Sequence, residues 1–153
     1  MAGMKFEDFS MQVKGAIDEA IMQYLNGASG ELVSQTARNS PTDQGQLKNS
    51  WNYNVDEGNQ ESKIGSPLEN AIWNEFGTGE YALEGNGRKG GWYVPEEELS
   101  EKAKSKMQKR IVKDNVYYFT KGKKPKRTFK KSYDALKPKL VKLAEDVMKG
   151  RLK

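Results

Sequence analysis

The side chains that most often do chemistry in proteins are few or absent in this chain. Its 153 residues contain no histidine and no cysteine. This excludes Ser-His-Asp and Cys-His nucleophiles, zinc fingers and disulfide frameworks, and leaves carboxylate catalysis and oxygen-ligand metal sites. The closest approach to a carboxylate pair is Glu96-Glu97-Glu98. Because adjacent side chains do not share a helix face, we interpret this run as solvated rather than catalytic.

A glycine-rich loop with two basic residues, 85–91, is the only candidate for a phosphate cradle. Its glycines lack the GxxxxGK[ST] spacing of a P-loop, and no helical pattern follows them. A surface loop is therefore the favoured interpretation. With no convincing catalytic pair, we expect a protein that is not an enzyme and needs no cofactor or metal.

A basic cluster lies near the carboxyl end of the chain. Its cations are Lys121, Lys123, Lys124, Lys126 and Arg127, and its aromatic neighbours are Tyr117, Tyr118, Phe119 and Phe129. Cations beside aromatic rings suit nucleic acid, through phosphate contacts and base stacking. The alternative is a turn with exposed lysines before a helix. The three tryptophans are either core residues or, with Trp73 as the candidate, contacts to a partner.

Charge is divided unevenly along the sequence. Residues 1–100 hold 7 basic and 16 acidic side chains, whereas residues 101–153 hold 19 and 5. The two halves should attract each other, either within one subunit or between neighbours, and the basic half could also meet a polyanion. A solvated, lysine-rich helix is the plainer alternative.

The apolar content is low, at 35% of the residues including tyrosine. This predicts a small core, which association with neighbours could stabilise. Uninterrupted apolar runs span only a few residues, far fewer than the roughly 20 that cross a bilayer. We therefore expect no membrane contact and a cytoplasmic site of synthesis.

Hydrophobic spacing predicts the elements in the first half. Apolar residues recur every three or four positions from Phe6 and Phe9 to Thr36, which predicts a long helix that ends before Pro41. A bend or break is expected near Gly27–Gly30, since glycine costs about 1 kcal/mol in a helix interior. Residues 41–45 then predict a turn. Alternation over 51–55 predicts a strand, with a hairpin turn at 57–59 and a return strand at 62–65.

The second half predicts shorter elements. A short helix should begin at Pro67, present one apolar face (Leu68, Ala71, Ile72 and Phe76) and end at Gly77 with positive φ. A strand at 92–94 should pair with one at 116–119. The charged residues 95–115 between them predict either a solvated helix or a flexible excursion. The closing helix, 126–149, should kink at Pro138.

This order predicts an α+β fold: a long N-terminal helix, a small antiparallel sheet of hairpins, a short central helix and a C-terminal helix. We expect one domain over residues 1–153, with a charged excursion at about 95–115.

Four short motifs, in this order, resemble the gene-product-ten-like putative tail components of phages. They are Ala37–Ser50 (with a Ser-Pro-x-Asp-x-Gly-x-Leu turn), Ile64–Ala71, Asn74–Gly79 (ending Glu-Phe-Gly-Thr-Gly) and Thr120–Pro125. The motif positions are turn and packing residues: Pro41, Asp43, Gly45, Gly65, Pro67, Phe76, Gly77, Gly79 and Pro125.

The resemblance implies a structural virion protein of a long-tailed phage, which completes the tail or joins it to the head at the neck. Its partners would be copies of itself in a ring and neighbouring neck and tail proteins: the tail terminator, tail tube, and stopper or connector. It would be assembled in the host cytoplasm, and contact with packaged DNA stays open. The alternative is a nucleic-acid-binding protein that uses the basic C-terminal third.

Overall fold

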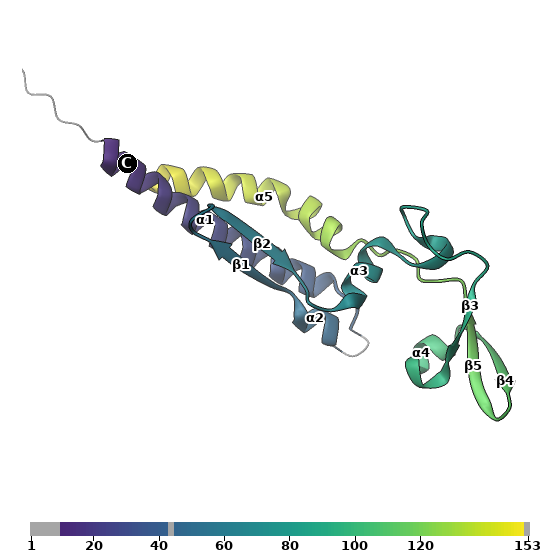
Figure 1. Ribbon diagram of the computed structural model, residues 1–153. Helices are drawn as coiled ribbons and strands as arrows, with labels where there is room; N and C mark the ends of the chain where they lie inside the picture. Colours follow the sequence, from purple (N-terminus) through teal and green to yellow (C-terminus); the bar gives the residue numbers. More distant parts are fainter. Residues whose placement is uncertain (1–9, 43–44, 152–153) are drawn as a thin grey trace, which may run out of the picture. The chain divides into compact units, whose positions relative to one another are not determined.

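The computed structural model describes residues 10–42 and 45–151, which form two units (Figure 1). The first unit comprises the described residues up to Pro67 and those from Phe129 onward, and the second comprises Leu68–Thr128. Both units combine helices with antiparallel strands, so the α+β prediction is confirmed. The strands form two separate sheets rather than one.

The first unit is built on two long helices, α1 (Ser10–Asn39) and α5 (Thr128–Arg151). Two ion pairs show that the helices run antiparallel: Lys139 meets Glu31 at 2.8 Å, and Arg151 meets Glu19 at 2.9 Å. Buried Leu32, Leu136 and Leu140 form the core between them. The hydrophobic core of the first unit therefore lies along the interface between these two helices.

Helix α1 does not break at its glycines. It is continuous from Ser10 to Asn39, so of the bend or break predicted near Gly27–Gly30 the break does not occur. A Cβ built on Gly27 would lie 3.3 Å from Leu143 Cδ2, which places this glycine at a close approach to α5. Helix–helix packing there outweighs the conformational cost of glycine. Phe6 and Phe9 lie outside the described residues.

A hairpin packs on α1 in the first unit (Figure 1). It consists of β1 (Asn52–Asp56) and β2 (Glu61–Gly65), with Tyr53 opposite Ile64. The exposed and half-buried positions alternate as predicted, and Ile64 packs against the leucine core. A five-residue helix, α2 (Gln46–Ser50), precedes β1 and had no signal in the hydrophobic spacing.

Helix α5 buries a narrow stripe, and Tyr133, which the helical spacing of Phe129, Tyr133, Leu136 and Leu140 predicts on that stripe, lies outside it. Leu136, Leu140 and Val147 are buried, but Tyr133 is exposed and its place on the inner face is taken by Ser132. Ser132 accepts a hydrogen bond from Asn39 Nδ2 at 2.9 Å, which needs a small polar residue at that point. Pro138 lies within the helix on its exposed side.

The second unit contains a short helix and a three-stranded sheet. Helix α3 (Glu69–Phe76) leads into a 3-10 turn, η1 (Gly79–Tyr81). The sheet has the order β3-β5-β4, with β3 at Trp92–Pro95, β4 at Gln108–Val112 and β5 at Asn115–Thr120. The predicted pairing of strands 92–94 and 116–119 is confirmed.

The charged segment 95–115 is neither a single helix nor an excursion without regular structure. It contains a 3-10 turn, η2 (Glu96–Glu98), a one-turn helix, α4 (Glu101–Lys104), and strand β4. Lys113 and Asp114 both have positive φ and make a two-residue connection to β5. A tight hairpin of this kind explains why β-branched Ile111 and Val112 form a strand despite their charged neighbours.

Helix α3 buries a different face from the one predicted. Ala71 and Asn74 are buried, whereas Ile72, Trp73 and Phe76 are exposed. Asn74 is buried because it hydrogen-bonds to the chain that precedes α5, as described below. Apolar residues therefore lie on the outer face of this helix. Within the described residues no helix has the length and apolar character to span a bilayer.

Candidate interaction surface

Two of the motif segments, Asn74–Gly79 and Thr120–Pro125, lie side by side in the second unit. We call them, with the residues up to 80 and up to 128 that continue them, the motif junction. Backbone hydrogen bonds join them: Thr78 N–H donates to Lys123 O at 2.9 Å, and Glu80 N–H donates to Lys121 O at 2.9 Å. The Thr78 hydroxyl accepts from Lys123 N–H at 2.8 Å. The segments thus form a short ladder although they are far apart in the sequence.

Glycines allow this close approach. Gly77 ends α3 with φ 76°, the positive φ predicted for it, and Gly79 has φ 60°. A Cβ on Gly77 would lie 2.7 Å from Tyr81 O and 2.8 Å from Pro125 Cδ. A Cβ on Gly122 would overlap the carbonyl of Thr78. Side chains at these positions are excluded by both backbone conformation and space.

Asn74 closes the other end of the junction. Its carbonyl accepts from Lys126 N–H at 2.8 Å, and its Nδ2 donates to Thr128 Oγ1 at 2.6 Å. Glu75 pairs with Arg127 at 3.6 Å, and Glu80 pairs with Lys121 at 3.6 Å. Lys121 and Arg127, two of the predicted contact cations, therefore form ion pairs within the chain.

Beside the junction lies an exposed group of large hydrophobic residues, which we call the apolar ridge. Ile72 is 61% exposed and Trp73 is 44% exposed. The complete ridge is Ile72, Trp73, Phe76, Tyr81 and Leu83. Leu83 N–H donates to Phe76 O at 2.9 Å, which holds the turn against the end of α3. Lys124 lies over the Tyr81 ring, with Nζ 5.5 Å from the ring centroid.

The ridge has the composition of a protein-binding surface. Contiguous apolar surface on a monomer marks interaction sites, and aromatic residues dominate the energetics of such sites. Cations at the edge add specificity and faster association rather than much affinity. Trp73, the predicted partner contact, lies at this surface, whereas Trp51 and Trp92 are half-buried.

The basic segment 121–127 has four exposed lysines, and two of the four aromatic neighbours predicted beside it are engaged elsewhere. Tyr118 is buried in the second unit. Phe129 belongs to the first unit, where it stacks on Trp51 with ring centroids 5.9 Å apart. These two rings are therefore engaged within the chain, whereas Tyr117 and Phe119 are half-buried. The nucleic-acid hypothesis keeps the exposed lysines for phosphate contacts and Tyr117 and Phe119 for stacking.

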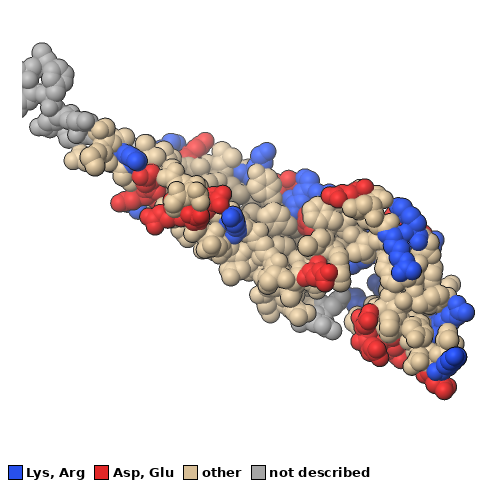
Figure 2. Space-filling model, in the orientation of Figure 1, with Lys and Arg blue, Asp and Glu red and all other residues tan. Residues whose placement is uncertain are grey.

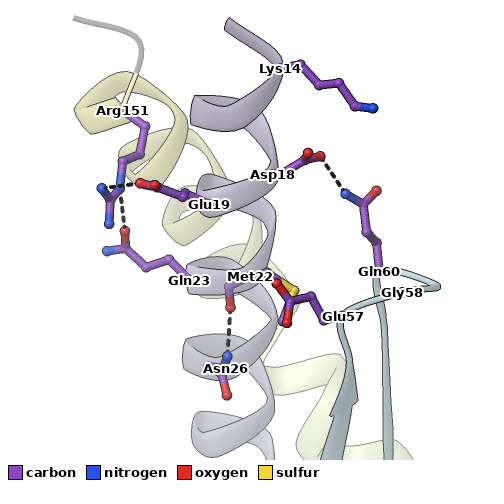
Figure 3. Close-up of a pocket in the computed structure, with 10 residues that line it drawn as sticks. All are labelled: Lys14, Asp18, Glu19, Met22, Gln23, Asn26, Glu57, Gly58, Gln60 and Arg151. Atoms are coloured by element: carbon purple, nitrogen blue, oxygen red, sulfur yellow. Dashed lines mark hydrogen bonds and ion pairs between the residues drawn. The ribbon is translucent and has the colours of Figure 1, made fainter. Parts of the chain in front are cut away.

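A polar groove of about 720 Å³ lies in the first unit (Figure 3). Asp18 accepts a hydrogen bond from Gln60 Nε2 at 2.7 Å, and Arg151 donates to Gln23 Oε1 at 3.1 Å as well as pairing with Glu19. Most of these polar groups satisfy one another. Among the residues that the structure describes, no three acidic side chains could hold a metal ion together.

Folding removes the contrast in charge between the two halves of the sequence. Because α5 returns to α1, the first unit contains 13 basic and 12 acidic residues and the second contains 13 and 9. Figure 2 shows acidic and basic atoms interspersed along the first unit. The attraction predicted between the two halves is thus met at least in part within one chain, by the Glu31–Lys139 and Glu19–Arg151 pairs.

The other motif residues lie in the first unit, away from the ridge in sequence. Pro41 follows α1, and Gly45 has φ 67° before α2. Gly65 ends β2, and Pro67 comes two residues later. Asp43 lies outside the described residues. The described residues of this group therefore occupy turns at the ends of helices and strands.

The sequence did not point to most of the ridge. Helical spacing placed Ile72 and Phe76 on a buried face, and Tyr81 and Leu83 were not singled out. The buried amide of Asn74 was the missing information, because its bond to Thr128 rotates the opposite face of α3 outward. The only local sign of this in the sequence was Asn74 itself, a polar residue between Trp73 and Glu75.

Comparison with protein families gives one match. Residues 5–77 match the family described as "Bacteriophage HK97-gp10, putative tail-component". The resemblance noted in the sequence is confirmed over this range, while the Thr120–Pro125 motif lies beyond it. No curated protein and no solved structure matches the chain. The match supports a structural role in a phage.

Proposed function

We propose that this chain is a structural virion protein of a phage neck or tail, which completes the tail or joins it to the head as part of an oligomeric ring. The observation that carries the proposal is the match of residues 5–77 to a phage tail-component family. Its partners are copies of itself and adjoining neck or tail proteins.

The surface of the second unit supports the proposal. Five large hydrophobic side chains on one short stretch, 72–83, are exposed in the single chain. A partner that covers them removes apolar area from water, worth about 25 cal/mol per Å². The ridge therefore suits contact with an adjoining neck or tail protein.

The proposal is tested by removing the chain from the phage that encodes it. The expected result is that DNA-filled heads and finished tails accumulate separately and that supplying the chain from a plasmid restores joined particles. Electron microscopy of lysates distinguishes the two. Normal numbers of joined, infectious particles without the chain would contradict the proposal.

The alternative, nucleic-acid binding, draws on the exposed lysines of the basic segment. Binding through phosphates would weaken with salt, with log K falling by about 0.9 per phosphate neutralised for each unit of log salt. Titration of labelled duplex DNA at several salt concentrations measures this slope. A steep slope that Lys123→Glu, Lys124→Glu and Lys126→Glu together abolish would favour the alternative.

A further inference from the structure

The hairpin of the first unit is a sheet of only two strands, and both of its outer edges are unpaired. Among the residues that the structure describes, no backbone hydrogen bond joins β1 or β2 to anything but its partner strand and the turn. A two-stranded hairpin is marginal alone and gains from further strands or from packing on a helix. Here α1 packs on the hairpin, and in the described part of the chain neither outer edge has a backbone hydrogen-bond partner beyond the hairpin.

The backbone groups that point outward can be identified. Tyr53 N–H donates to the side-chain Oδ1 of Asn52 at 2.8 Å, so it points away from β2. In an antiparallel pair, outward and inward groups alternate. The backbone groups that point outward are therefore those of Tyr53 and Val55 on one edge, and those of Ser62 and Ile64 on the other.

The edges of the other sheet are protected, and the hairpin edges are less so. Outer strand β3 ends in Pro95, and outer strand β4 carries Lys109 and Arg110, which would repel a second copy of the same strand. Proline and like charge are the devices that keep edges unpaired. β1 contains neither proline nor lysine, and the β2 edge carries one acid and one base.

We propose that β2 of one copy pairs with β1 of the next copy, so that the hairpins form a continuous antiparallel sheet. This inference rests on the proposed ring. Copies related by rotation present β1 and β2 in the same order. The strand direction therefore keeps alternating from one copy to the next, as an antiparallel sheet requires. The contact uses two different edges and is therefore the head-to-tail kind that closes rings.

Charge selects the register. Within the hairpin Asp56 lies opposite Glu61, and a neighbour in the same register would repeat this like-charge pair. A shift of two residues instead places Lys63 opposite Asp56 of the next copy. Lys63 has its side chain 79% exposed and forms an ion pair at 3.3 Å with Glu61, two positions earlier on the same strand. Its charge also acts on Asp56 of its own chain, so the shifted register adds a second Asp56 to a cation that is exposed to solvent.

The shifted register also satisfies the backbone and the inner face. It places the outward groups of Ile64 opposite those of Val55 of the next copy, which is the alignment that hydrogen bonding requires. Both side chains lie on the half-buried side of the hairpin, so apolar meets apolar. The Asn52 side chain would give up its bond to Tyr53 N–H where the ladder reaches that residue.

Single-cysteine variants test the register, because the natural chain has no cysteine. Lys63→Cys and Asp56→Cys would lie in a pair without backbone hydrogen bonds, with Cα atoms about 4.5 Å apart, within disulfide range. Mixing the two purified variants under mild oxidation should give a mixed disulfide dimer, identified by mass. Neither variant alone should cross-link. Gly65→Cys with Asn54→Cys is a second pair that leaves the Asp56 turn intact.

Glu61→Cys mixed with Asp56→Cys is the matched control, because those positions meet only in the register that repeats the like-charge pair. Native mass spectrometry of the unmodified chain is run in parallel. Oligomers without the Lys63–Asp56 or Gly65–Asn54 cross-links would overturn the hairpin contact and leave the proposed function standing. A chain that is monomeric at every concentration, with no cross-link, would contradict both the contact and the self-assembled ring.

Discussion

The two units of this chain use their hydrophobic residues in opposite ways. Among the described residues, the first unit holds six of the buried hydrophobics and four of the large exposed ones, whereas the second holds two and eight. The first unit is held together by a leucine seam between two helices. The second is held together by backbone hydrogen bonds across the motif junction and the sheet.

The difference teaches where assembly acts. A unit with a packed seam can be stable in an isolated subunit, because apolar burial supplies the main favourable free energy of folding. A unit that exposes Trp73 and Phe76 gains that term only when a partner covers them. We therefore expect the second unit to be the less stable one in the monomer and the one that assembly protects.

The largest expected effect is on the seam of the first unit. Leu140→Ala removes part of the core and should lower the free energy of unfolding by about 2–5 kcal/mol. Val141→Ala, at the next position but exposed, is the control and should change it by less than about 0.5 kcal/mol. Urea denaturation followed by circular dichroism measures both. Equal effects would show that the seam is not the core.

A slightly smaller effect is expected in the motif junction. Gly77→Val places a side chain where φ is 76° and a carbonyl lies 2.7 Å from the new Cβ, and should cost about 3 kcal/mol in the second unit. Gly30→Ala in α1, with open space at its Cβ, should instead stabilise the first unit by about 1 kcal/mol. Hydrogen exchange by mass spectrometry assigns each change to its unit. If Gly77→Val left the hydrogen-exchange protection of residues 74–80 unchanged, the close packing around Gly77 would be disproved.

Hydrogen exchange in the unmodified monomer sharpens the same comparison. Amides in the middle of α1 and α5 should exchange most slowly, and those of α4 and β4 faster, since β4 is an exposed outer strand. Assembly should slow exchange in the second unit. Slower exchange in β4 than in α5 of a dilute monomer would reverse the order of stability proposed for the units.

The smallest effect concerns the pair that links α5 to α1. A hydrogen bond and the charge of Lys139 lower the pKa of Glu31. A lowered folded-state pKa means that the contribution is complete above the ordinary glutamate range, near 4.3, and is lost as the pH falls through the lower folded-state value. Glu31→Gln should therefore flatten the acid side of the stability profile slightly. Glu145→Gln on α5 is the control. Identical stability profiles for the two variants would show that the Glu31–Lys139 pair contributes nothing to stability.

Sequence reasoning worked where structure is decided locally. The long helix, the 52–65 hairpin and the end of α3 at Gly77 follow from spacing, turn residues and a glycine with positive φ. Strand β4 was missed because Leu99, Ala103, Met107 and Ile111 fall by coincidence at helical spacing. Its turn, Lys113-Asp114, lacks the glycine that usually marks a two-residue hairpin.

The candidate surface depends on tertiary contacts that no local pattern contains. Which face of α3 is buried is fixed by Asn74 and Thr128, 54 positions apart. The return of α5 to α1 likewise cancels a charge contrast that is obvious in the linear sequence. The motif residues were recognisable as a set, but only the fold shows that Gly77, Gly79 and Pro125 meet in one junction.

The most direct test of the central claim is head–tail joining by a ridge variant. Trp73→Ser with Phe76→Ser removes the aromatic ridge, and Tyr133→Ser removes a side chain of similar exposure, 43% against 44%, from the first unit. Circular dichroism first verifies that each variant is folded. Each variant is then supplied to the phage that lacks the chain. The account predicts that Tyr133→Ser restores joined particles and that the ridge variant does not. Normal joining by the folded ridge variant would contradict the claim that this surface holds the chain in the particle.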